Sequence, residues 1–153
     1  MFHARFMLTG LIVIVPVWSQ AQPPPRPAPP RLEPIAEAKL LMEGLAHPNF
    51  KALDRLVKEE PMDAEAWHFG RGQSLLLAET ANLLMLRPPK SPRAEAAWMA
   101  RAMEFRDAAV KMAKTTAAKD LPKSQAALLS LAATCNRCHE TFRVEMRVKP
   151  GEK

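Results

Sequence analysis

Two cysteines stand three positions apart late in the chain and are followed at once by a histidine, in the run Cys135-Asn136-Arg137-Cys138-His139. A Cys-x-x-Cys-His run is the pattern by which c-type haem is attached to a polypeptide. Each thiol can form a thioether with a vinyl group of the macrocycle, and the adjacent imidazole can then ligate the iron. The residues therefore predict one covalent haem c, held by Cys135 and Cys138 with His139 as axial ligand.

Two other chemistries use paired cysteines. A dithiol oxidoreductase of the thioredoxin type has the same spacing, but it belongs beside a βαβ unit, which this sequence does not predict. A structural zinc site needs four ligands, and only His47 or His68 could complete the motif. A disulfide between the two cysteines would close a tiny loop and constrain little of the unfolded chain. Haem attachment is the favoured interpretation.

The motif must be positioned by helices, because the residues after the first 34 are dominated by helix formers and no run alternates as a strand would. Apolar residues recur every three or four positions in four stretches. The last stretch starts after Asp120 and Pro122, and its apolar stripe contains Leu128, Ala132, Cys135, His139, Phe142 and Met146. That stripe would present the motif to the interior of the domain.

Prolines and polar caps divide the other three stretches. The stripe of the first contains Ile35, Ala38, Met42 and Leu45 and resumes at Phe50, Leu53 and Val57. It should be disturbed at Pro48, which lacks the amide that would bond to the carbonyl of Gly44. The second starts after Asp63, and the third starts at Ser91 with Pro92 in the first helical position. These patterns predict an all-α, antiparallel, up-down-up-down four-helix bundle over residues 35–147, with the haem inside it and 148–153 as a tail.

The first 34 residues have a different composition. Arg5 precedes the apolar run from Phe6 to Trp18, and Ser19 and Ala21 suit a signal peptidase, so residues 1–21 are interpreted as a secretory signal. The run is shorter than the roughly 20 residues that a membrane span requires, so no stable span is expected. Residues 22–34 contain seven of the 15 prolines and predict an extended spacer. Export agrees with haem c, because this haem is attached outside the cytoplasm.

The charge of the chain bears on its partners. There are 22 Lys and Arg against 16 Asp and Glu among 153 residues. Basic and acidic residues are interleaved along all the helical stretches, which gives nucleic-acid binding little support. A modest positive surface would instead favour salt-dependent docking with an acidic redox partner protein.

A four-helix chain in which the haem motif lies in the last helix and continues as Phe142-Arg143 resembles the class II c-type cytochromes, the cytochrome c′ family. The resemblance implies a periplasmic, non-enzymatic haem protein that transfers electrons or binds small gases such as NO and CO, often as a homodimer. By position, Cys135 and Cys138 hold the haem, His139 ligates the iron, and Arg143 lies near a haem propionate. Arg143 is one turn after His139, so its guanidinium can reach a carboxylate there. Phe142 is expected to pack against the haem.

The resemblance leaves the sixth position of the iron open. Some members keep the iron five-coordinate behind an apolar wall, and others place a methionine of the first helix on it. Met42 is the expected ligand here, and its thioether would stabilise reduced iron and favour electron transfer over gas binding. Otherwise Leu41 or Met42 would form a steric wall, and the protein would bind gases. His47 and His68 are alternative ligands, each expected at a cap or on the surface.

Overall fold

The computed structural model describes residues 32–58 and 62–151. The expected signal 1–21 and the spacer up to residue 31 lie outside the described residues. From Leu32 onward the chain forms one compact unit, and all regular secondary structure in its described part is helical. The elements are α1 (Ala38–Leu41), the π-helical turn η1 (Met42–Ala46), α2 (His47–Leu56), α3 (Ala64–Met85), α4 (Pro92–Ala117) and α5 (Leu121–Thr141). Within that part, no helix combines the length and apolar character needed to span a membrane.

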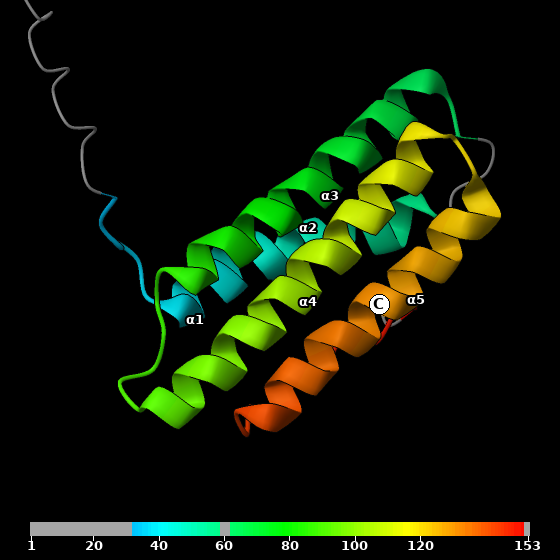
Figure 1. Ribbon diagram of the computed structural model, residues 1–153. Coiled ribbons are helices and arrows are strands. Elements are labelled where there is room, and N and C mark those ends of the chain that lie inside the picture. Colours follow the sequence, from blue (N-terminus) through cyan, green and yellow to red (C-terminus); the bar gives the residue numbers. More distant parts are fainter. Residues whose placement is uncertain (1–31, 59–61, 152–153) are drawn as a thin grey trace, which may run out of the picture. The chain divides into compact units, whose positions relative to one another are not determined.

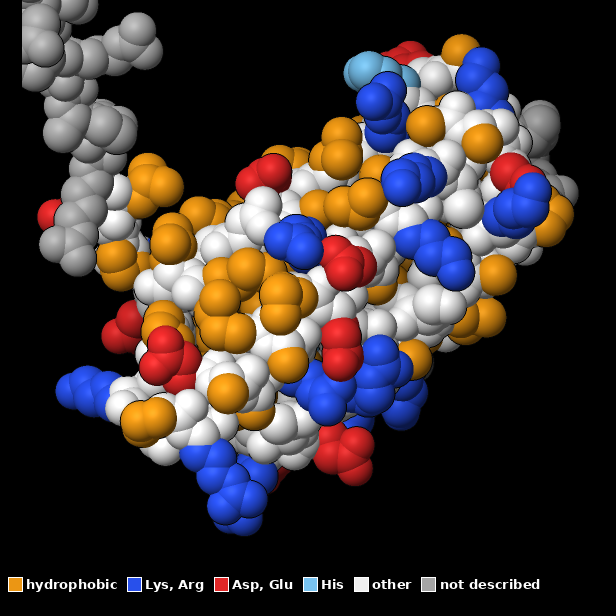
Figure 2. All heavy atoms as spheres, viewed as in Figure 1, with side chains coloured by type: hydrophobic (Ala, Val, Ile, Leu, Met, Phe, Trp, Pro, Cys, Tyr) orange, Lys and Arg blue, Asp and Glu red, His pale blue; other side chains and the backbone are white. Residues whose placement is uncertain are grey.

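The helices form an antiparallel bundle. Elements α1, η1 and α2 follow one another without a break and act as one long helical element. This element packs on α3, α3 packs along α4, and α4 packs along α5, with the direction of the chain reversing at each step (Figure 1). The predicted all-α four-helix bundle is therefore confirmed. Figure 2 shows that on one face of the molecule basic and acidic side chains are interspersed with hydrophobic ones.

Local capping explains where the helices begin. The Asp63 carboxylate accepts a hydrogen bond from the Ala66 amide at 2.7 Å, and Asp120 accepts one from the Lys123 amide at 3.0 Å. Such bonds satisfy amides that have no partner inside the helix. Ser91 occupies the N-cap position of α4 without a side-chain bond, and Pro92 follows it in the first turn. The starts predicted from Asp63, Ser91 and Asp120 are all confirmed.

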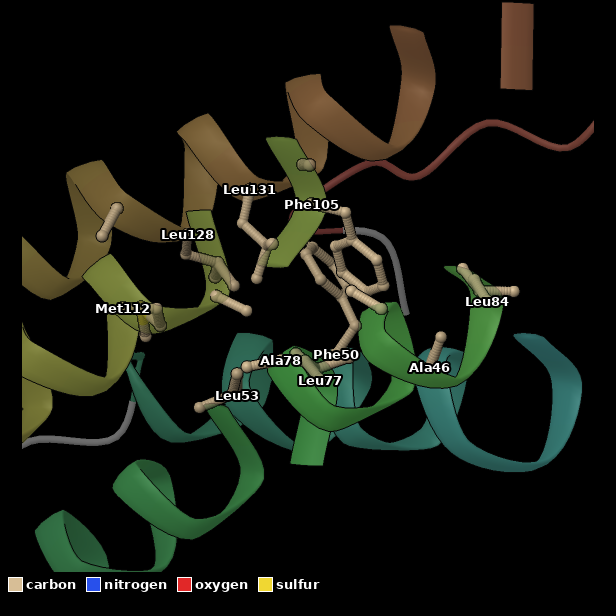
Figure 3. Packing of buried hydrophobic residues seen from close by; sticks show 14 of the residues in the cluster. Ala46, Phe50, Leu53, Leu77, Ala78, Leu84, Phe105, Met112, Leu128 and Leu131 are labelled. Carbon is tan, nitrogen blue, oxygen red and sulfur yellow. The ribbon is translucent and has the colours of Figure 1, made fainter. Parts of the chain in front are cut away.

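The core lies between the four elements and includes side chains from each of them. Leu53 of α2, Leu77 of α3, Met112 of α4 and Leu131 of α5 are fully buried, and Figure 3 shows them converging. Burying a side chain of this size contributes about 1.5–3 kcal/mol relative to leaving it in water. The core thus fixes α5, which carries the cysteine motif, against the other helices.

The first helical element departs from the expected stripe. Ile35 precedes α1 and is 89% exposed, so its assignment to the inner face was wrong. The disturbance expected at Pro48 takes the form of the π-helical turn that directly precedes α2. A π turn closes i→i+5 hydrogen bonds and is therefore wider than an α turn. The chain accommodates the proline without breaking the helix.

The last helix is shorter than expected. It ends at Thr141, and Arg143 adopts a left-handed backbone conformation with φ of 57°. The Val144 amide then donates to the His139 carbonyl at 2.8 Å, and the Arg143 amide donates to Glu140 at 3.2 Å. This pair of bonds is a Schellman motif, which ends a helix and turns the chain back.

The residues after this turn form a segment that we call the C-terminal strap, residues 144–151. The placement of Met146 on a helical stripe was therefore wrong. Val148 packs against the core, and the Gly151 amide donates to both carboxylate oxygens of Asp54 at 3.0 and 3.1 Å. Gly151 thus ties the strap to α2.

Candidate haem site

A cavity of about 530 Å³ lies between the first helical element, α3, α4, α5 and the strap. Its volume falls within the range of roughly 300–1,000 Å³ that is common for small-molecule and cofactor sites. Most of the lining is apolar, including Ala46, Phe50, Leu77, Leu84, Ala102 and Phe105. Such walls exclude water and strengthen electrostatic interactions inside the cavity.

All three reactive residues of the motif line this cavity. Cys135, Cys138 and His139 come from the last two turns of α5, and both cysteines are free thiols. Cys135 and His139 are four positions apart and lie on one face of the helix. The structure therefore brings the two thiols and the imidazole to a single apolar site.

The imidazole of His139 is held by a hydrogen bond to the strap. The residue is 7% exposed, and its Nδ1 lies 2.9 Å from the backbone carbonyl oxygen of Met146 in the strap. A carbonyl can only accept, so Nδ1 carries a proton, and Nε2 of the neutral ring then keeps its lone pair. Histidines that ligate metals usually donate their other ring N–H to such an acceptor. This tautomer is the one that an axial ligand of iron needs.

The surroundings of both thiols favour the protonated form. Burial raises the pKa of Cys135 to about 12, and the nearby Cys138 sulfur adds to this effect. Burial also raises the pKa of Cys138, while the positive charge of Arg101 opposes the shift. A dithiol oxidoreductase needs a nucleophilic cysteine with a lowered pKa. The site thus lacks the electrostatics of a redox-active dithiol.

The zinc interpretation gains no support from the structure. Across residues 32–58 and 62–151, no group of three or more His, Cys, Asp or Glu side chains is placed to hold a metal ion by itself. His68 is exposed on α3 and does not line the cavity. His47 does line it, although the residue as a whole is exposed.

The first helical element supplies the wall that contains Met42. Four residues spaced four apart face the cavity from this element, namely Ala38, Met42, Ala46 and Phe50. In a regular α-helix each four-residue step would drift by about 40° around the axis. The wider π turn counters this drift. Leu41, the other candidate for a distal wall, is buried in the core and does not line the cavity.

Beyond the motif, Phe142 also lines the cavity. Its ring meets that of Trp98 edge to face, with centroids 5.1 Å apart, and the Trp98 indole Nε1 donates to the Leu84 carbonyl at 2.7 Å. The contact joins the end of α5 to the start of α4. Phe142 is therefore held in place by an aromatic neighbour that is itself hydrogen-bonded.

The comparison with known proteins agrees with this geometry. Residues 93–143 match the family model of cytochrome C′. This match supports a cytochrome c′ family assignment. The matched segment covers nearly all of α4 and all of α5, and it ends just after the motif. No curated protein and no solved structure matches the chain significantly.

Cytochromes c′ are haem c proteins, and the residues of this cavity fit that group. Two protonated thiols are available for the vinyl carbons, one imidazole has a free Nε2, and apolar side chains surround them. Met42 lies on the cavity wall that the first helical element provides, where the sequence predicted a methionine ligand.

Two arginines differ from the sequence-based picture of a cytochrome c′. Arg143 is exposed and does not line the cavity, so its contact with a propionate stays a prediction. Arg101 does line it, and its guanidinium lies 2.7 Å from Glu104. Sequence reasoning did not identify Arg101 as a site residue. Its position one turn after Trp98, which also lines the cavity, is the signal that could have found it.

Proposed function

We propose that this protein is an exported monohaem cytochrome of the c′ family that transfers single electrons. In this proposal Cys135 and Cys138 hold the haem as thioethers, and His139 ligates the iron. The proposal rests on one observation above all: both thiols and an Nδ1-anchored imidazole meet in one apolar cavity. When bound there, the haem would supply Fe(III)/Fe(II) exchange.

The residues of the chain would divide the work as follows. The thiols are protonated, and each would add its sulfur to a vinyl carbon and its hydrogen to the other carbon, so no oxidant or reductant is needed. The Met146 carbonyl keeps the His139 ring in the tautomer with Nε2 free. Phe50, Leu77 and Phe105 keep water out of the cavity. The thioether of Met42 would fill the sixth position and favour the reduced iron.

The test begins with the protein made in a host that matures c-type haem. A haem stain that survives a denaturing gel is expected for the wild type and should be lost when both cysteines are replaced by alanine. The oxidised spectrum is expected to be low-spin and to become high-spin in Met42→Ala. Absence of covalent haem in the wild type would reject the proposal. His47→Ala is the matched control, because His47 lines the same wall.

A second candidate function is binding of NO or CO at a five-coordinate haem. It is favoured by the apolar side chains of Ala46 and Phe50, which line the cavity on the same wall as Met42. A high-spin wild-type spectrum, unchanged in Met42→Ala, together with ready CO binding, would select this function over electron transfer.

The proposal includes export to the periplasm, where cytochromes c′ are typically found. N-terminal sequencing of the mature protein should read from Gln22 if residues 1–21 are removed. Docking with an acidic redox partner protein should weaken as the salt concentration rises. Sedimentation of the mature protein would show whether it forms the homodimer that is common in the family.

A further inference from the structure

The C-terminal strap forms part of the cavity wall beside His139. Val144, Met146 and Val148 line the cavity together with His139. The strap has no regular secondary structure, so its backbone must be held by bonds to other elements if the Met146 carbonyl is to stay on the imidazole. The identity of those bonds decides what controls the orientation of His139.

Asn136, the first residue between the two cysteines, makes two of them. Its Nδ2 donates to the Val148 carbonyl at 2.8 Å, and its Oδ1 accepts from the Val148 amide at 2.7 Å. The side-chain amide thus pairs with both backbone groups of one residue, as a neighbouring strand would. Both bonds fix the strap two residues beyond Met146, and both come from the same helix that carries His139.

The strap is fixed again at Gly151, by the carboxylate of Asp54. Asp54 is only 2% exposed, and it is also bonded to Lys58 at 2.9 Å. The Met146 carbonyl additionally accepts from the Arg147 guanidinium at 3.1 Å, which leaves one lone pair for His139. Asn136 bonds the strap two residues from the Met146 carbonyl, and Asp54 bonds it five residues away.

We propose that Asn136 is a positioning residue for His139. It holds Val148, and through Val148 the Met146 carbonyl, against Nδ1 of the imidazole. This inference rests on the proposed function, in which Nε2 of His139 ligates iron. A hydrogen bond at Nδ1 makes the imidazole a more basic ligand, which favours Fe(III) and lowers the reduction potential. Loss of the Asn136 bonds should therefore raise the potential.

The experiment compares the haem-loaded wild type with Asn136→Ala and Asn136→Leu. Leucine has the same branched skeleton of four heavy atoms as asparagine but forms no hydrogen bonds, so it separates the lost bonds from the loss of the side chain. Asn82→Ala is the matched control, because the Asn82 amide donates to Glu79 within α3, away from the strap. Circular dichroism verifies that each variant keeps its helices. The readouts are the reduction potential and the exchange rate of the His139 Nδ1 proton, followed by proton NMR in D₂O.

Both Asn136 variants should show a raised potential and Nδ1 proton exchange at least about tenfold faster, as expected when two hydrogen bonds are lost. Asn82→Ala should match the wild type in both. If either Asn136 variant keeps the wild-type potential and exchange rate while carrying covalent haem, the positioning role is overturned and the proposed function stands. A wild type without covalent haem would overturn both.

Discussion

The contact between Trp98 and Phe142 offers a quantitative test of how the end of α5 is held at the cavity. Replacing Trp98 by phenylalanine keeps an aromatic ring but removes the indole bond to the Leu84 carbonyl. The expected cost is about 0.5–1.5 kcal/mol, the net value of a hydrogen bond. The Leu84 carbonyl also accepts from the Arg87 amide at 2.9 Å, so it would not be left without a partner. Trp98→Leu removes the aromatic pair as well, which adds about 0.5–1.5 kcal/mol.

A double-mutant cycle isolates the free energy of the contact between the Trp98 and Phe142 rings. Trp98→Leu, Phe142→Leu and the double variant are unfolded with urea as haem-loaded proteins, and the coupling free energy is taken from the four values. A coupling of about 0.5–1.5 kcal/mol is expected from the ring geometry. Trp67→Leu with Phe142→Leu is the control. Trp67 does not line the cavity, so the free-energy changes of these two substitutions should add without coupling. A coupling for Trp98 no larger than that of the control would refute the reasoning.

Three further results are expected. Arg143→Gly should raise the free energy of unfolding by about 1 kcal/mol, since glycine adopts a positive φ without strain; lower stability in urea would contradict this. Leu53→Ala should cost about 2–5 kcal/mol while leaving the haem spectrum unchanged, because Leu53 is buried away from the cavity; a loss under 1 kcal/mol by urea unfolding would count against the described core. In the haem-free polypeptide, the Cys135 pKa of about 12 exceeds that of an unfolded thiol. The stabilising contribution of the protonated thiol is therefore full below about pH 8.5 and is lost toward pH 12. In urea unfolding from pH 8 upward, Cys135→Ala should lose less stability than the wild type, and equal losses would reject this.

The helices could be predicted from the sequence where local chemistry determines them. Asp63 and Asp120 cap their helices through bonds that reach only three residues along the chain. Pro92 suits a first turn whatever the rest of the protein does. The reactive residues of the site could be predicted for a similar reason, because the spacing of Cys135, Cys138 and His139 is itself the signal.

Other features depend on contacts that sequence spacing does not reveal. The end of α5 was missed because Arg143, and not a glycine, occupies the left-handed position. The anchoring of His139 was missed because its partner is a backbone carbonyl, brought back by the strap and held by Asn136. Leu41 and Met42 could not be told apart as wall residues, since their orientation depends on the π turn.

The π-helical turn at Met42–Ala46 also constrains how the first helical element can change length. The turn holds one more residue than an α-helical turn, and a side chain at Gly44 would meet no atom within 4 Å. Deleting Gly44 would remove this extra residue and convert the segment to regular α-helix. Met42 would then stand seven positions before Phe50, and seven α-helical residues turn by about 700°, which keeps both side chains on one face. The π turn thus acts as a one-residue insertion that keeps Met42 on the cavity wall, and the proposed sixth ligand should survive deletion of Gly44.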